Sequence, residues 1–90
     1  MWKDGRKYTG TWLANKMNGK GVMEWPNGRY YEGEYVEDRK EGHGLFKWGD
    51  GRVFEGEWKN GKQHGEGVFT DKEGNARQGV WEGGNRTKWL

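Results

Sequence analysis

Hydrophobic and polar residues alternate along short segments of this chain, and the alternation recurs. Residues 31–35 read Tyr-Glu-Gly-Glu-Tyr, so a strand would carry both rings and the glycine on one face and both carboxylates on the other. Residues 42–48 would likewise place Gly42, Gly44, Phe46 and Trp48 on a common face. This period of two predicts β-strands with one aromatic face.

Tight-turn dipeptides separate the predicted strands. They are Asp4-Gly5, Asn27-Gly28, Asp50-Gly51 and Asn60-Gly61, whose residues tolerate the positive φ angles of hairpin turns. Turn signals every ~10–12 residues, between runs of ~5–7 residues, are typical of an up-and-down meander.

A period of 23 residues runs through the sequence. Glycines recur at this spacing, and so do rings at Trp12, Tyr35, Trp58 and Trp81. The period divides residues 1–90 into one array, with a partial unit at 1–7, repeats at 8–30, 31–53 and 54–76, and a degenerate unit at 77–90. Internal repetition of this length is the signature of a stacked repeat architecture.

The two ends of the array depart from the pattern. At the start, Trp2 and Gly5 are in phase with Trp25 and Gly28, so the chain opens in mid-unit. In the last unit Arg77 replaces the aromatic residue, and the Gly-x-Gly strand is missing. Degenerate terminal units are typical of caps, so residues 77–90 are predicted to cap the array.

The recurrent glycines have a packing role. A single sheet without a second layer must bury its rings against itself, and a glycine on the neighbouring strand leaves a floor on which a ring can lie. We therefore expect an all-β fold, an elongated single-layer antiparallel β-meander of stacked 23-residue β-hairpins. About seven strands would span roughly 35 Å.

Composition narrows the class of protein. Hydrophobic residues make up only 30% of the chain, which is typical of disorder, but aromatic residues reach 16% and argue for a fold. The absence of Cys and Ser removes disulfides, thiolate sites and the commonest nucleophiles. With no membrane-spanning run or signal peptide, we expect a cytoplasmic protein.

Three units carry the same pair of motifs. They are Tyr8-Thr9-Gly10-Thr11-Trp12 with Gly19-Lys20-Gly21, Tyr31-Glu32-Gly33-Glu34-Tyr35 with Gly42-His43-Gly44, and Phe54-Glu55-Gly56-Glu57-Trp58 with Gly65-Glu66-Gly67. These units closely resemble MORN (membrane occupation and recognition nexus) repeats. The resemblance implies one hairpin per repeat in an extended, grooved sheet. It also implies anionic phospholipid binding, docking of a partner's peptide or helix, or self-association as roles.

The ordered rings are the first candidate binding residues. A one-layer sheet cannot cover both sides of every ring, and exposed apolar surface usually marks an interaction site. The rings would form an aromatic groove for a partner's apolar side chains, or simply the core. The predicted groove residues are Tyr8, Trp12, Trp25, Tyr31, Tyr35, Trp48, Phe54, Trp58 and Trp81.

The charges are unevenly distributed along the chain. The formal net charge is +2, with an excess of basic residues in the first third and of acidic residues in the middle. Basic residues near an anionic leaflet each contribute about 1 kcal/mol, so a phospholipid surface is the second candidate partner. Its predicted contacts are Lys3, Arg6, Lys7, Lys16, Lys20 and Arg29. The low net charge argues against nucleic acid.

No constellation in the sequence indicates catalysis. His43 and His64 are out of step with the repeat and lack hydroxyl partners or metal-ligand spacing. The Gly-x-Gly pairs lack the third glycine and following helix of a dinucleotide site. We therefore predict a non-catalytic interaction scaffold without cofactor or metal, for protein docking or self-association. The alternative is a peripheral phosphoinositide-binding module, such as the regulatory part of a lipid kinase.

Overall fold

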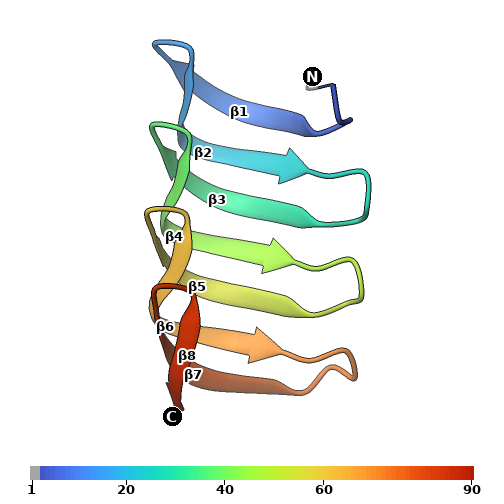
Figure 1. Cartoon of the computed structure of the whole chain (residues 1–90), viewed down its shortest axis with the longest axis vertical. Coiled ribbons are helices and arrows are strands. Elements are labelled where there is room, and N and C mark those ends of the chain that lie inside the picture. Colours follow the sequence, from blue (N-terminus) through green and yellow to red (C-terminus); the bar gives the residue numbers. More distant parts are fainter. Residues whose placement is uncertain (1–2) are drawn as a thin grey trace.

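Residues 3–90 of the computed structural model form one antiparallel sheet of eight strands, paired in the order of the chain (Figure 1). The strands are β1 (Lys7–Leu13), β2 (Lys16–Glu24), β3 (Tyr30–Val36), β4 (Arg39–Lys47), β5 (Val53–Lys59), β6 (Lys62–Thr70), β7 (Ala76–Glu82) and β8 (Asn85–Trp89). The longest dimension is 39 Å. The predicted all-β meander of hairpins is confirmed; Trp2, in phase with Trp25, lies outside the described residues.

Two kinds of connection alternate at the two sides of the sheet (Figure 1). Two-residue turns with positive φ at both positions join the strands of each hairpin, as at Asn60-Gly61. The corresponding turn Glu37-Asp38 has φ angles of 48° and 68° without any glycine. Longer loops join successive hairpins, and in one of them the Asn27 side-chain oxygen accepts the Arg29 backbone N–H at 3.1 Å.

A bulge in the second strand of each regular hairpin explains why that strand is longer than the first. Gly33 pairs with Gly44, but Tyr35 pairs with Lys40, so β4 holds two extra residues across the same interval. Gly42 lies in this interval with φ of +70°. Such bulges bend a strand and increase its twist. They give the sheet a curvature that the alternation of residues did not predict.

Rings packed over glycines form the core. A Cβ atom added at Gly44 would lie 2.5 Å from Cε1 of Tyr31, and one added at Gly67 would lie 2.5 Å from Cε1 of Phe54. Tyr31 and Phe54 are both fully buried. The predicted glycine floor is therefore confirmed for the rings of the central repeats.

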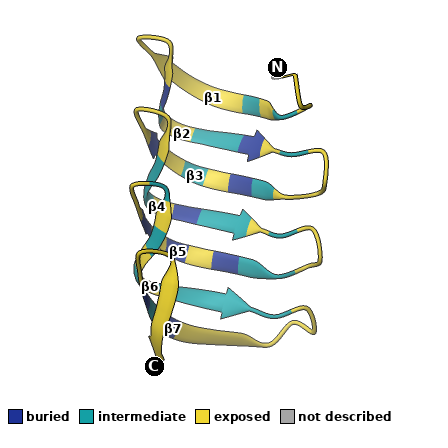
Figure 2. Cartoon of the chain, viewed as in Figure 1, coloured by how far each residue is buried: buried dark blue, intermediate teal, exposed yellow. Residues whose placement is uncertain are grey.

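Burial is concentrated in the inner strands. Figure 2 shows buried residues along β3 and β5, whereas β1 is mostly exposed. Trp12 on β1 is 50% exposed, but its equivalent Trp58 on β5 is only 7% exposed.

The last unit differs from the prediction. A strand, β8, forms without a Gly-x-Gly motif, so the described residues contain eight strands rather than about seven. The two-residue turn Gly83-Gly84 closes this hairpin, and its register places Gly79 opposite Trp89. Cε3 of Trp89 would lie 3.1 Å from a Cβ atom at Gly79, so this ring covers the glycine in place of the missing motif.

Candidate functional site

The structure gathers the predicted groove residues on one face of the sheet, here called the aromatic face. Tyr31, Tyr35, Phe54, Trp58 and Trp81 are buried there as the core. Edge-to-face contacts connect them, such as Tyr31 to Trp58 at 5.5 Å between ring centroids. Tyr8, Trp25 and Trp48 are half-buried, and Trp12 is exposed. The buried rings contact one another, so only the less buried ones remain accessible to a partner.

A second row of rings, the outer row, runs beside the buried one and is only half-buried. Its members are Trp25, Phe46, Trp48, Phe69 and Trp89. Neighbouring centroids lie 4.8 to 6.5 Å apart. The prediction of the groove omitted Phe46, Phe69 and Trp89. Phe46 could have been found, since alternation already placed it with Trp48 on the aromatic face.

Cationic side chains lie over the outer row. Guanidinium carbons lie 5.9 Å (Arg29) from the Trp25 centroid, 5.1 Å (Arg52) from that of Trp48 and 4.3 Å (Arg86) from that of Trp89. Cations at these distances are attracted by the negative ring face. Arg77, which replaces the expected ring, lies 4.8 Å from the Trp89 centroid. The aromatic face therefore also carries cations, of which Arg52 forms an ion pair with Asp50 at 2.9 Å.

Lys40 is the most enclosed of these cations. Its Nζ lies between 5.5 and 5.8 Å from the centroids of four rings, which belong to Trp25, Tyr31, Phe46 and Trp58. Burial, and to a smaller extent the charge of Arg29, lowers the pKa of Lys40 below its usual value. The ammonium is thus held in a less polar environment than that of a surface lysine.

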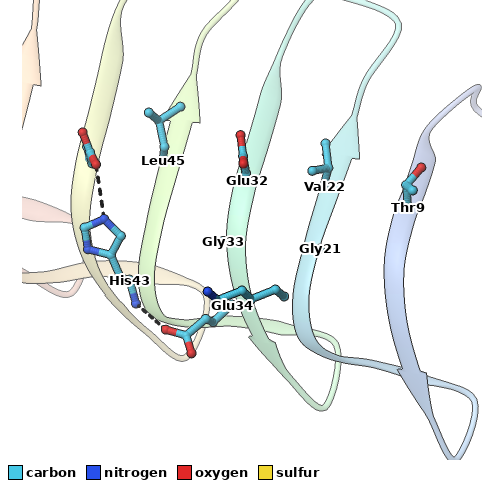
Figure 3. Close-up of a pocket in the computed structure, with 10 residues that line it drawn as sticks. Thr9, Gly21, Val22, Glu32, Gly33, Glu34, His43 and Leu45 are labelled. Atoms are coloured by element: carbon cyan, nitrogen blue, oxygen red, sulfur yellow. Dashed lines mark hydrogen bonds and ion pairs between the residues drawn. The ribbon is translucent and has the colours of Figure 1, made fainter.

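The opposite face, here called the acidic face, carries carboxylates. An open groove of about 720 Å³ lies over its strands and is lined by Glu32, Glu34 and Glu55, with Leu45 between strands β3 and β5 (Figure 3). His43 lines the same groove, as its position in the alternation predicted, and its Nε2 lies 3.3 Å from Oε2 of Glu55. Both side chains are more than half exposed, so this pair contributes little to stability.

The six predicted phospholipid contacts do not come together in one patch. Arg6 lies directly before β1 and Arg29 in the loop between β2 and β3, whereas Lys16 begins β2 at the other side of the sheet. Lys20 lines the acidic groove, on the opposite face from the outer row. Lys3 lies in the turn before β1, and Lys7 alternates with Tyr8 onto the acidic face. Of the six, Arg29 lies over a ring of the outer row, that of Trp25.

Residues 3–90 contain no group of three or more His, Asp or Glu side chains arranged to hold a metal ion. No helix capable of crossing a membrane occurs in this part of the chain. Among the described residues, the polar side chains that contact the His43 ring are the carboxylates of Glu55 and Glu57. The surfaces that residues 3–90 offer for binding are the aromatic face and the groove of the acidic face.

Comparison with known families agrees with the geometry. The sequence model of the MORN repeat matches three times, at residues 8–28, 31–51 and 54–76. The chain therefore belongs to the MORN repeat family, whose members form a repeat module for interaction with proteins or membranes. The search of curated proteins gave no match.

Stability is expected to fall above pH 10 because two buried tyrosines resist ionisation. Burial is the main cause that raises the pKa of Tyr31 and of Tyr35 well above the ordinary value. The unfolded chain releases these protons near pH 10, whereas the folded chain keeps them. The free energy of unfolding is therefore unaffected below pH 10 and falls above it, by about 1.4 kcal/mol per pH unit for each tyrosine.

Urea unfolding of Tyr31→Phe and of the parent chain between pH 8 and pH 11 tests this expectation. The sheet accommodates Phe54 at the equivalent position, so the ring should be tolerated. Loss of the hydrogen bond from the Tyr31 hydroxyl to the Glu34 carbonyl should cost about 1 kcal/mol at pH 8. Above pH 10 the variant should lose stability less steeply. Parallel curves for the two proteins would show that Tyr31 ionises normally.

Proposed function

We propose that this chain is a non-catalytic docking module that binds a partner protein across its aromatic face. The supporting observation is the outer row of rings, which no second layer covers among residues 3–90. Contiguous exposed apolar surface marks interaction sites, and aromatic and arginine side chains are enriched in protein interfaces. The aromatic face has both kinds of residue, as in Arg86 over Trp89.

Two adjacent residues on β6 provide a matched test. Phe69 belongs to the outer row. Val68 directly precedes it in the strand and lies on the acidic face. Both are half-buried. A photoreactive benzoylphenylalanine placed at either position should therefore be tolerated about equally, while it faces opposite sides of the sheet.

Irradiation in cell extract should give a discrete crosslinked protein from position 69 and not from position 68. Excess unlabelled chain should compete with the crosslink. A covalent dimer of the chain at position 69 would identify a second copy as the partner, which is the self-association alternative. Crosslinks from position 68 alone, or equally from both, would overturn the proposal that the aromatic face is the docking surface.

Binding to anionic phospholipid is a second candidate, and the cations over the outer row support it. With the cations of the outer row turned toward a membrane, Glu32 and Glu55 would point away from it. Irradiation of the same two photoreactive variants in the presence of phosphatidylserine vesicles tests this second candidate. Lipid adducts from position 69, lost at high salt and absent with neutral vesicles, are the expected result. No adduct at low salt would leave only the protein partner.

A further inference from the structure

Position 40 is exceptional among its repeat equivalents. Met17 and Gln63 occupy the same place in the neighbouring repeats, and neither carries a charge. In each of these three repeats the backbone carbonyl accepts an N–H from the turn of the next hairpin, at 3.0 Å from Asp38, Gly61 or Gly84. The backbone is thus held alike in all three repeats. The charge of Lys40 is not needed for the fold of this position.

The ammonium of Lys40 has no anionic partner in the part of the chain that the structure describes. No described carboxylate lies within 4.0 Å of its Nζ, and no hydrogen bond from Nζ is formed. Its nearest described electrostatic contacts are the four ring faces. No buried side-chain nitrogen or oxygen among the described residues lacks a partner, so the Nζ still reaches solvent.

Lys40 lines a recess of about 260 Å³ on the aromatic face. Phe46, Trp48 and Trp58 supply its apolar lining, and Lys62 also contributes to the wall. The positive charge of Lys40 disfavours a cationic ligand in this recess. The rings favour a ligand in which methylene groups adjoin the negatively charged group. A glutamate side chain has this structure.

We propose that the recess, here called the Lys40 pocket, binds a glutamate side chain of the partner protein. The carboxylate would accept a charge-assisted hydrogen bond from Nζ of Lys40, and its methylene groups would lie against Trp48 and Trp58. The ammonium is already partly buried and lies among four rings in the free protein, so less ordering is needed on binding. This inference rests on the proposed docking function and assigns a chemistry to its centre.

A small probe tests the Lys40 pocket independently of any partner. N-acetylglutamate N-methylamide carries the carboxylate, and N-acetylglutamine N-methylamide has nearly the same shape without the charge. Titration is followed by NMR of the indole N–H groups of Trp48 and Trp58. The glutamate probe should bind at millimolar concentration and shift both signals, and it should raise the pKa of Lys40. The glutamine probe should bind at least about tenfold more weakly.

Lys40→Met is the matched variant, because the sheet already holds Met17 at the equivalent position. Circular dichroism should show that this variant is folded. Its affinity for the glutamate probe should fall by at least about tenfold. Lys62→Met should weaken binding less, since Lys62 is exposed. Equal shifts with both probes, or unchanged binding to Lys40→Met, would overturn the proposal. Should Lys40→Met unfold, the glutamine probe alone still decides.

The outcomes separate this inference from the proposed function. Probe binding at Lys40 without a crosslink from position 69 would support the pocket and reject the docking surface. A crosslinked partner whose affinity is unchanged by Lys40→Met would support the docking surface and reject the pocket. Both proposals are supported if the Lys40→Met variant binds the partner more weakly and a Glu→Gln substitution in the partner does not weaken the binding to that variant any further.

Discussion

Gly44→Val is expected to destabilise the sheet by about 3 kcal/mol, the upper end of the range for an overpacked core. A side chain at this position would overlap the ring of Tyr31, which is fully buried. The ring cannot move aside, since Trp58 and Tyr35 contact it edge-to-face at 5.5 and 5.2 Å. The backbone of β4 must therefore shift, with loss of its pairing to β3.

His43→Val is the control, because it introduces the same side chain at the adjacent position of the same strand. His43 is exposed on the acidic face, so the change should remain within about 0.5 kcal/mol. Urea unfolding followed by far-ultraviolet circular dichroism measures both variants. A loss below about 0.5 kcal/mol for Gly44→Val would show that the glycine floor is not required.

Much of this fold could be predicted from local chemistry. Alternation along residues 31–35 correctly places Tyr31 and Tyr35 on the aromatic face, because side-chain direction in a strand depends only on position. The 23-residue period then places every equivalent ring in a row. The turn at Asn60-Gly61 was also predictable, since these residues favour positive φ.

The features that were missed depend on long-range geometry. The turn Glu37-Asp38 has no glycine and is stabilised from the preceding hairpin, where the Met17 N–H donates to Oδ1 of Asp38 at 2.7 Å. The bulges follow from pairing between strands. β8 forms because its turn and pairing partner are present, although its sequence lacks the motif of the other repeats. Single-sequence patterns do not report such contacts.

The grouping of charged residues at the candidate site could not be predicted from the sequence either. Counting along the chain indicated a basic first third and an acidic middle, and it selected residues such as Lys20 as phospholipid contacts. In the folded chain the surroundings of each charge depend on its place in the sheet instead, since Lys20 lies in the acidic groove and Arg52 lies over Trp48. The cations over the outer row come from three different units, with Arg29 in residues 8–30, Arg52 in 31–53 and Arg86 in 77–90. Their grouping requires the register of the whole sheet.

Trp58→Ala should cost about 3–5 kcal/mol, the usual range for removing a buried aromatic side chain. Trp58 joins the two rows of rings, with centroids 5.5 Å from Phe54 and 6.0 Å from Phe46. Its indole N–H also donates to the Gly44 carbonyl at 3.0 Å. Removal leaves a cavity, an unpaired carbonyl and a more exposed Lys40. This loss is a large fraction of the stability of a domain of this size.

Trp12→Ala is the matched comparison, since Trp12 occupies the same place two repeats earlier and is half exposed. Because half of its surface is already exposed to solvent, removing the Trp12 ring should cost about 1 kcal/mol. Circular dichroism is the readout for both, because each variant changes the fluorescence directly. Equal losses would mean that burial within the array does not determine stability. A much larger loss for Trp58 would show that each ring depends on the repeats on both sides of it.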